Sequence, residues 1–278
     1  MPPREGIREA GWWHVAAASL RRDVLMARSY PVGFVLGMAG SVFGVLSILF
    51  LDAAFGNSAA GSLDAYGRSY FAFAVIGVAL STFMATGLSG MASRVREGQL
   101  MGTLELLLVS PNPLPLLLFS SALWAHARAL LTLGLYLLIA IPLGMDVSRA
   151  NWPVAVVSLL LAVVSFNALG LVASAYVIVL KQGNPVTLVL TAASSLLAGV
   201  LYPVTVLPDW LQAIAWFLPL THALELARRS ILAGEGLDAL FGPFASLLVL
   251  TAILLPVGAW IVDRAVRVAK TDGSLSQY

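Results

Sequence analysis

The chain has no cysteine, and it has only three histidines among its 278 residues. Disulfide bonds and thiolate metal sites are therefore excluded, and a histidine metal centre is not expected. Charged residues are also scarce, at 11% of the sequence. The two lysines, Lys181 and Lys270, do not follow glycine-rich turns, and the phosphate-binding pattern G-x-x-x-x-G-K-[ST] is absent. We therefore expect the chain to bind no cofactor and to hydrolyse no nucleotide by itself.

Apolar sequence is abundant instead, because 59% of the residues are hydrophobic and the mean hydropathy is +0.90. A helix needs roughly 20 apolar residues to cross a bilayer. Uncharged stretches of this length predict four spans directly, and Pro203 and Pro208 shorten a fifth. We predict an all-α membrane protein with about six transmembrane helices. They are expected near residues 30–51, 69–93, 116–143, 152–180, 186–201 and 240–263.

The third span has an ambiguous start, because His126 and Arg128 interrupt its apolar sequence. If the span begins near Leu116, both side chains lie inside the membrane, where ionisable groups usually have a function. If it begins at Ala129, the Arg128 side chain extends to the cytosolic interface. We expect the second arrangement.

An even number of spans places both termini on one side of the membrane. The lysines and arginines then lie on that side as well, except for Arg68, Arg149, Arg228 and Arg229. Positive residues in short loops favour the cytoplasm, so both termini are predicted to be cytoplasmic. The basic residues lie at the ends of spans and form no single patch. We therefore expect the lipid bilayer as a partner, and no nucleic acid.

Residues 1–28 precede the first span and contain an amphipathic segment from Glu9 to Arg28. Trp13 and Leu20 fall on one helical face, and Arg21 falls on another. This pattern predicts a helix that lies in the membrane interface, where tryptophan is favoured. The alternative is a cytosolic segment that merely leads into the first span.

The segment from Arg94 to Pro111 is charged and amphipathic, although it lies between two long apolar runs. Arg94, Glu97 and Glu105 concentrate charge that is rare elsewhere in the chain. We interpret residues 94–110 as a docking helix on the cytosolic side, which a partner outside the membrane recognises.

Residues 202–234 are too apolar for an open loop and too often interrupted by proline for one span. We predict a re-entrant helical hairpin packed against the other spans, because lipid cannot satisfy irregular backbone. The hairpin could line a pathway or simply fill a gap. Glu225 lies three and four residues before Arg228 and Arg229, which predicts a structural ion pair. A polar lip at the exit of a pathway is the alternative.

Gly87, Ser89 and Gly90 form a G-x-S-G string, which in rhomboid-type intramembrane proteases carries the nucleophilic serine. Such an enzyme needs a histidine on a neighbouring span, and His126 and His222 are the candidates. Small residues on a spanning helix more often permit close helix packing. We predict packing positions and keep the protease as an alternative of a different class.

Two groups of residues carry a family resemblance. The first group is Arg94, Glu97-Gly98, Gly102-Thr103-Leu104-Glu105, Leu107 and Ser110-Pro111. The second is Leu201-Tyr202-Pro203, Leu207-Pro208, Trp210-Leu211, Pro219-Leu220-Thr221 and Arg228. They resemble the coupling segment and the hairpin of the permeases of second-type ATP-binding-cassette exporters, and the order of elements agrees over nearly the whole chain. His222 and Leu218 depart from the family pattern at positions that bear on substrate selection.

The resemblance implies that residues 29–278 form one permease domain, which dimerises in the bacterial cell membrane. It also implies two copies of a separate cytosolic ATPase, which bind ATP and Mg and supply the energy. The residues it assigns to ATPase coupling are Arg94, Arg96, Glu97, Gly98, Thr103, Leu104, Glu105 and Ser110. Those it assigns to the hairpin gate are Tyr202, Pro203, Pro208, Trp210, Pro219, Thr221, His222, Glu225 and Arg228.

The substrate class follows only from a narrower resemblance, to daunorubicin-resistance and nodulation-factor exporters. It implies export of an amphipathic drug or a lipid-like molecule. A polysaccharide or lipid-linked glycan exporter is the alternative within the same family, and an isolated channel is a weaker one outside it.

Overall fold

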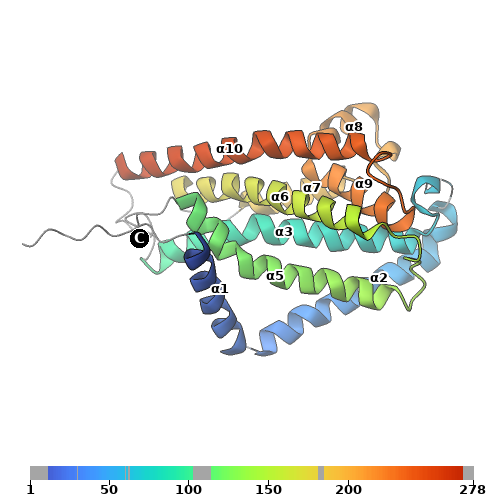
Figure 1. The fold of residues 1–278 in the computed structure, drawn as a ribbon, viewed down its shortest axis with the longest axis horizontal. Helices are drawn as coiled ribbons and strands as arrows, with labels where there is room; N and C mark the ends of the chain where they lie inside the picture. The colour runs from blue at the N-terminus through green and yellow to red at the C-terminus, as the bar shows by residue number, and fades with distance from the viewer. Residues whose placement is uncertain are drawn as a thin grey trace, which may run out of the picture.

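The computed structural model describes residues 12–29, 31–59, 61, 63–102, 114–180 and 185–271. The regular elements in these ranges are all helices (Figure 1). They are α1 (Trp12–Ser29), α2 (Pro31–Ala59), η2 (Asp64–Tyr66), α3 (Tyr70–Leu100), α5 (Leu114–Ala140), α6 (Trp152–Leu180), α7 (Pro185–Leu197), η3 (Val204–Val206), α8 (Asp209–Trp216), α9 (Pro219–Leu232) and α10 (Phe241–Thr271).

The prediction of an all-α membrane protein is confirmed. Five helices contain a segment that is long and apolar enough to cross a membrane, namely α2, α3, α5, α6 and α10. The apolar part of α7, Thr187–Leu197, is shorter. At 1.5 Å per residue, α7 is about 20 Å long at most, which is less than the thickness of the hydrocarbon core of a bilayer.

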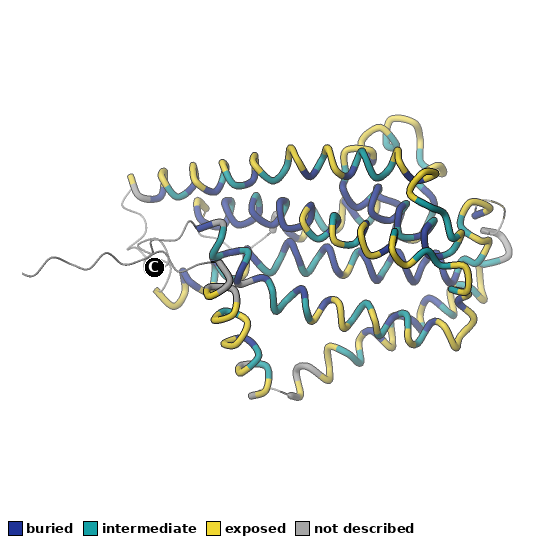
Figure 2. Tube along the Cα trace, in the orientation of Figure 1, coloured by how far each residue is buried: buried dark blue, intermediate teal, exposed yellow. Residues whose placement is uncertain are grey.

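The long helices form a bundle in which α3 and α6 are central, with α5 and α10 on either side (Figure 1). Burial is accordingly concentrated in α3, α6 and α9, whereas α2 and α10 expose most of their outer surface (Figure 2). The central helices approach closely because small residues lie at their crossing. A Cβ atom on Gly170 of α6 would lie 2.8 Å from the carbonyl oxygen of Gly87 on α3.

The two ends of the bundle have different constructions. Helix α1 lies at the end where α3 and α10 finish, and it runs across the bundle axis (Figure 1). That orientation is the one expected of an interfacial helix, and the helix itself covers most of the predicted segment. The opposite end carries η2, α8 and α9, with α9 packed against α6, α3 and α10.

Several boundaries differ from the predicted ones. Helix α3 continues through Arg94 to Leu100 without a break, and α7 ends at Leu197 because a turn with a left-handed Gly199 follows. The third span was expected to begin at Ala129, whereas helix α5 begins at Leu114. Arg128 therefore lies in the middle of the helix and within the apolar segment Leu116–Ala140. The apolar stretch from residue 114 to residue 125 is long enough to extend the span. The two ring nitrogens of His126 are hydrogen-bonded within the chain, to Ala122 and Asn167.

Candidate functional site

The charged end of α3 is one predicted functional region, and its two faces have different environments. One face is buried against α6, where the fully buried Gln99 donates its side-chain amide to the carbonyl oxygen of Val177 at 3.0 Å. The other face carries Arg94 and the exposed Glu97, whose charged groups lie 3.4 Å apart. The described part of the segment is therefore amphipathic, and residues 94–100 are the end of α3.

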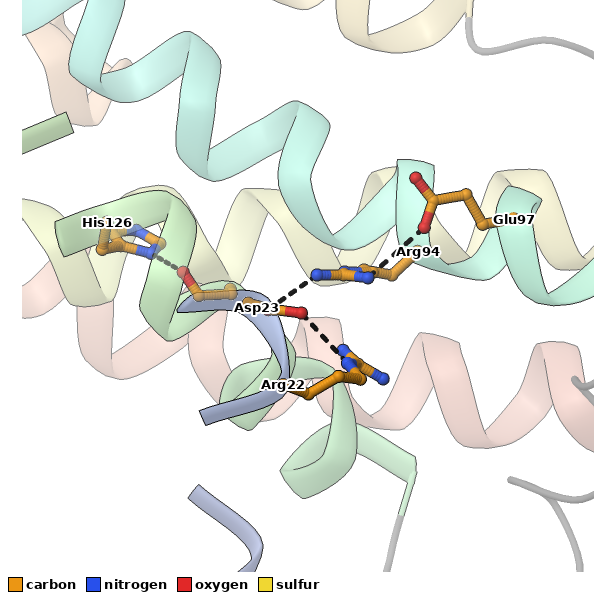
Figure 3. A network of polar contacts seen from close by, with 6 residues as sticks. Arg22, Asp23, Arg94, Glu97 and His126 are labelled. Carbon is orange, nitrogen blue, oxygen red and sulfur yellow. Dashed lines mark hydrogen bonds and ion pairs between the residues drawn. The ribbon is translucent and has the colours of Figure 1, made fainter. Parts of the chain in front are cut away.

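Asp23 of α1 contacts this region through its carboxylate (Figure 3). Its side chain is only 2% exposed, and its two oxygens lie 2.7 Å from the Arg94 guanidinium and 3.0 Å from that of Arg22. The contact with Arg94 is an ion pair without the alignment of a hydrogen bond. It joins α1 directly to the end of α3. Sequence reasoning missed Asp23, although an isolated acid in an arginine-rich helix is a signal for such pairing.

The predicted coupling residues are only partly described. Arg94, Arg96, Glu97 and Gly98 occupy the last two turns of α3. Thr103, Leu104, Glu105 and Ser110 lie outside the described residues.

Two apolar side chains at the tip of α3 were not singled out from the sequence. Leu100 and Met101 are 69% and 74% exposed, beyond the charged turns of the helix. Leu100 is the last residue of the apolar segment Tyr70–Leu100, and Met101 follows it directly, so both exposed side chains lie at the very end of that candidate span. Their signal in the sequence is an apolar pair shortly after the charged residues Arg96 and Glu97.

The second predicted region is the hairpin, and Arg228 anchors it. This residue of α9 is 3% exposed, and its guanidinium donates to the carbonyl oxygens of Gly199 at 3.0 Å and Val200 at 2.7 Å. It also donates to the carbonyl oxygen of Phe73 at 3.2 Å and stacks on the Phe73 ring at 3.4 Å. Arg228 therefore binds the carbonyl groups that follow α7 and ties them to α3.

Glu225 forms the ion pair that its spacing predicted. Its partner is Arg229, at 3.2 Å, and Arg229 also lies 2.5 Å from Glu235. The Tyr66 hydroxyl donates to the other oxygen of Glu225 at 2.6 Å. Burial and this bond to a carboxylate raise the pKa of Tyr66, so the phenol remains a neutral donor. These contacts hold η2 against α9.

Four of the predicted hairpin residues line one cavity of about 440 Å³, namely Thr221, His222, Glu225 and Arg228. Thr221 and His222 bond the carbonyl oxygens of Ala215 and Trp216, at 2.6 and 2.7 Å, and so join α9 to the end of α8. The other residues lie on the connection before α8 or at helix ends: Tyr202, Pro203, Pro208, Trp210 and Pro219. A cavity lined in part by these four residues therefore lies between the hairpin and the start of α10.

Ser89 has the contacts of an ordinary helix residue. Its hydroxyl donates to the carbonyl oxygen of Ala85 at 2.7 Å. His126 bonds Ala122 at 2.8 Å and Asn167 at 3.2 Å, while His222 bonds Trp216. Neither histidine is hydrogen-bonded to Ser89 in the described part of the chain. The geometry therefore does not support the protease alternative.

Ser89→Ala is accordingly expected to change the melting temperature and the activity of the protein very little, with an effect within about 0.5 kcal/mol. Gly170→Val is the contrasting variant, because its side chain would meet the Gly87 carbonyl, and it should destabilise by roughly 1–3 kcal/mol. Thermal unfolding in detergent measures both. Loss of activity in Ser89→Ala, with unchanged folding, would revive the protease alternative.

The fold and these two regions define a polytopic all-α membrane protein with a charged end on its second spanning helix and a helical hairpin at the opposite end. The family model described as ABC-2 type transporter matches residues 18–232. The chain belongs to this family, and it is the membrane-spanning permease component of an ABC transporter. No curated protein matches the chain.

Proposed function

We propose that this permease works as an exporter, in which two copies of the chain form the pathway across the bacterial cell membrane. A separate cytosolic ATPase, also present in two copies, binds ATP and Mg and supplies the energy. Both termini and the tip of α3 face the cytoplasm. Closure of the two ATPases displaces the ends of the α3 helices, which shifts the dimer between inward-open and outward-open states.

The contact between Asp23 and Arg94 is the observation that supports this mechanism most directly. Because the ion pair joins α1 to the end of α3, a force on that end is transmitted to a helix lying across the bundle (Figure 3). Gln99 joins the same end to α6. A push at the α3 tip can therefore move several helices together.

The substrate that we propose is an amphipathic drug or lipid-like molecule. The hairpin cavity is consistent with this class, because ionisable and aromatic side chains such as Glu225 and Trp216 line it together. A polysaccharide or lipid-linked glycan is the second candidate within the family. The hairpin would act as the gate at the outer end.

Variants at the apolar tip of α3, Leu100 and Met101, test whether the ATPase docks there. The double variant Leu100→Glu with Met101→Glu should reduce co-purification of an ATP-binding-cassette ATPase from the same genome, beginning with the neighbouring reading frame. Burial of two such side chains is worth about 3 kcal/mol, so the loss should exceed tenfold. Val268→Glu, on an exposed apolar residue near the end of α10, is the matched control. Undiminished co-purification of the double variant would remove the docking role from this tip.

A further inference from the structure

A cavity of about 330 Å³ lies between α2, α3 and α5, separate from both regions described above. Its polar lining consists of Ser41, Thr82, Thr86, Thr132, Tyr136 and Arg128. A volume of this size lies within the range of small-molecule sites. The lining is unusual because each of these three helices contains a segment long and apolar enough to cross a membrane.

Arg128 lies in the middle of α5, within the apolar span Leu116–Ala140. It forms no ion pair and no hydrogen bond with any residue that the structure describes, and its side chain is exposed into the cavity. No Asp or Glu occurs in α5, in α2 before Asp52, or in α3 before Glu97. These three helices therefore supply no counter-ion to Arg128, and an isolated charge within a span is costly and normally has a function.

The other polar groups make the cavity rich in hydrogen-bond donors. The hydroxyls of Thr82 and Thr86 already donate to carbonyl groups of their own helix, at 2.8 and 2.9 Å. The hydroxyls of Ser41 and Thr132 have no such partner among the described residues. Together with the five N–H groups of Arg128 they can all donate to one bound group.

The path of α2 explains why the cavity is open. At Gly44 this helix meets α5, because a Cβ atom there would lie 2.9 Å from the Tyr136 hydroxyl. Closer to its start, α2 diverges from the bundle (Figure 1). A Cβ atom on Gly37 or Gly40 would meet nothing within 4 Å. The divergence leaves a wedge-shaped space beside Arg128.

We propose that this cavity binds an amphiphile through a phosphate, sulfonate or carboxylate group that pairs with Arg128. The planar guanidinium can bind such a group with two parallel hydrogen bonds, and Ser41 and Thr132 can donate to its remaining oxygens. The apolar surfaces of α2 and α5 accommodate the tail. The role of this site in transport rests on the export function proposed above, whereas binding of the amphiphile can be tested without an ATPase.

Binding is measured by native mass spectrometry of the whole chain, purified in a neutral detergent and titrated with dodecyl phosphate. We expect saturable binding that is weakened at least about tenfold in Arg128→Gln, because a hydrogen-bonded charge pair is lost. Arg128→Lys should retain part of the affinity. Arg267→Gln, which removes an exposed arginine near the end of α10, should bind as the unaltered chain does. Equal binding by Arg128→Gln would overturn the proposal.

Three further probes identify what the site recognises. Dodecanol has the same tail but no anionic group, and inorganic phosphate has the charge but no tail, so both should bind much more weakly. Equal binding of dodecanol would overturn the proposal. Competition by phosphatidylglycerol would identify a bilayer lipid as the natural source of the anion, and absence of competition would identify a single-chain amphiphile.

The stability of the unliganded variants gives an independent readout. Because Arg128 has no partner among the described residues, Arg128→Gln and Arg128→Leu should melt at the same temperature as the unaltered chain or higher. Added dodecyl phosphate should raise the melting temperature of the unaltered chain only. A lower melting temperature of both unliganded variants would show that Arg128 is a structural residue and would overturn the proposal.

Discussion

Replacing Arg228 with methionine is expected to lower the melting temperature of the purified chain by roughly 6–12 °C. The variant keeps an apolar side chain of similar length but leaves the carbonyl oxygens of Gly199 and Val200 buried without their donor. Each unsatisfied buried acceptor costs roughly 1–3 kcal/mol, so a loss of about 3 kcal/mol is expected. Arg228→Lys should also destabilise, because a single ammonium group cannot reproduce the fork of the guanidinium.

The adjacent residue provides the control for this experiment. Arg229 has the same charge and lies on the same helix, but it is 26% exposed and pairs with Glu225 and Glu235. Arg229→Met should cost about 1 kcal/mol or less, since partly exposed ion pairs contribute little. Equal shifts of the melting temperature in the two variants would show that Arg228 does not anchor the hairpin.

Much of the fold could be predicted from sequence, because transmembrane helices are set by the length of apolar sequence between charges. The spans at Tyr70, Trp152 and Phe241 begin close to the predicted residues. The boundaries set by tertiary contacts could not be predicted in this way. Helix α3 continues past Ser93 because Val95 and Gln99 are buried against neighbouring helices, which no local pattern indicates.

In the hairpin, too, the sequence predicts some contacts of single residues and not others. Spacing along the chain predicted that Glu225 would pair with Arg228 or Arg229, and the pair with Arg229 is confirmed. The role of Arg228 could not be predicted, because its partners are backbone carbonyl groups up to 155 residues away. Gly77 belongs to the same arrangement. A Cβ atom there would lie 2.0 Å from the Val200 carbonyl oxygen, and nothing in the sequence marks that contact.

The position of Arg128 within α5 could not be predicted for a related reason. The sequence shows a charge near one end of an apolar stretch, and a charge at an interface is the ordinary case. Only the packing of α2 and α3 against α5 reveals a polar cavity that can hold the side chain. A cavity between three helices leaves no signature in any one of them.

The ion pair between α1 and α3 predicts a charge-swap result. Asp23→Arg alone would place three arginines together, and Arg94→Asp alone would place two acids together. Each single variant should lower the melting temperature by roughly 4–8 °C, which corresponds to about 2 kcal/mol for a buried carboxylate paired with partly exposed arginines. The assembled complex with its ATPase should also lose ATP hydrolysis that depends on the permease.

The double variant Asp23→Arg with Arg94→Asp restores one opposite pair, so it should recover most of the stability and of the hydrolysis rate. The coupling energy of the two positions is obtained from the four melting temperatures. The matched control is the swap of Asp64 and Arg68, an ion pair at 2.6 Å whose side chains are 63% and 74% exposed. Its single variants should change stability by less than about 0.5 kcal/mol, because solvent screens the pair. If the Asp23 and Arg94 variants behave additively like that control pair, α1 is not coupled to α3 through this contact, and the movement of the α3 tip must reach the bundle through Gln99 and α6 instead.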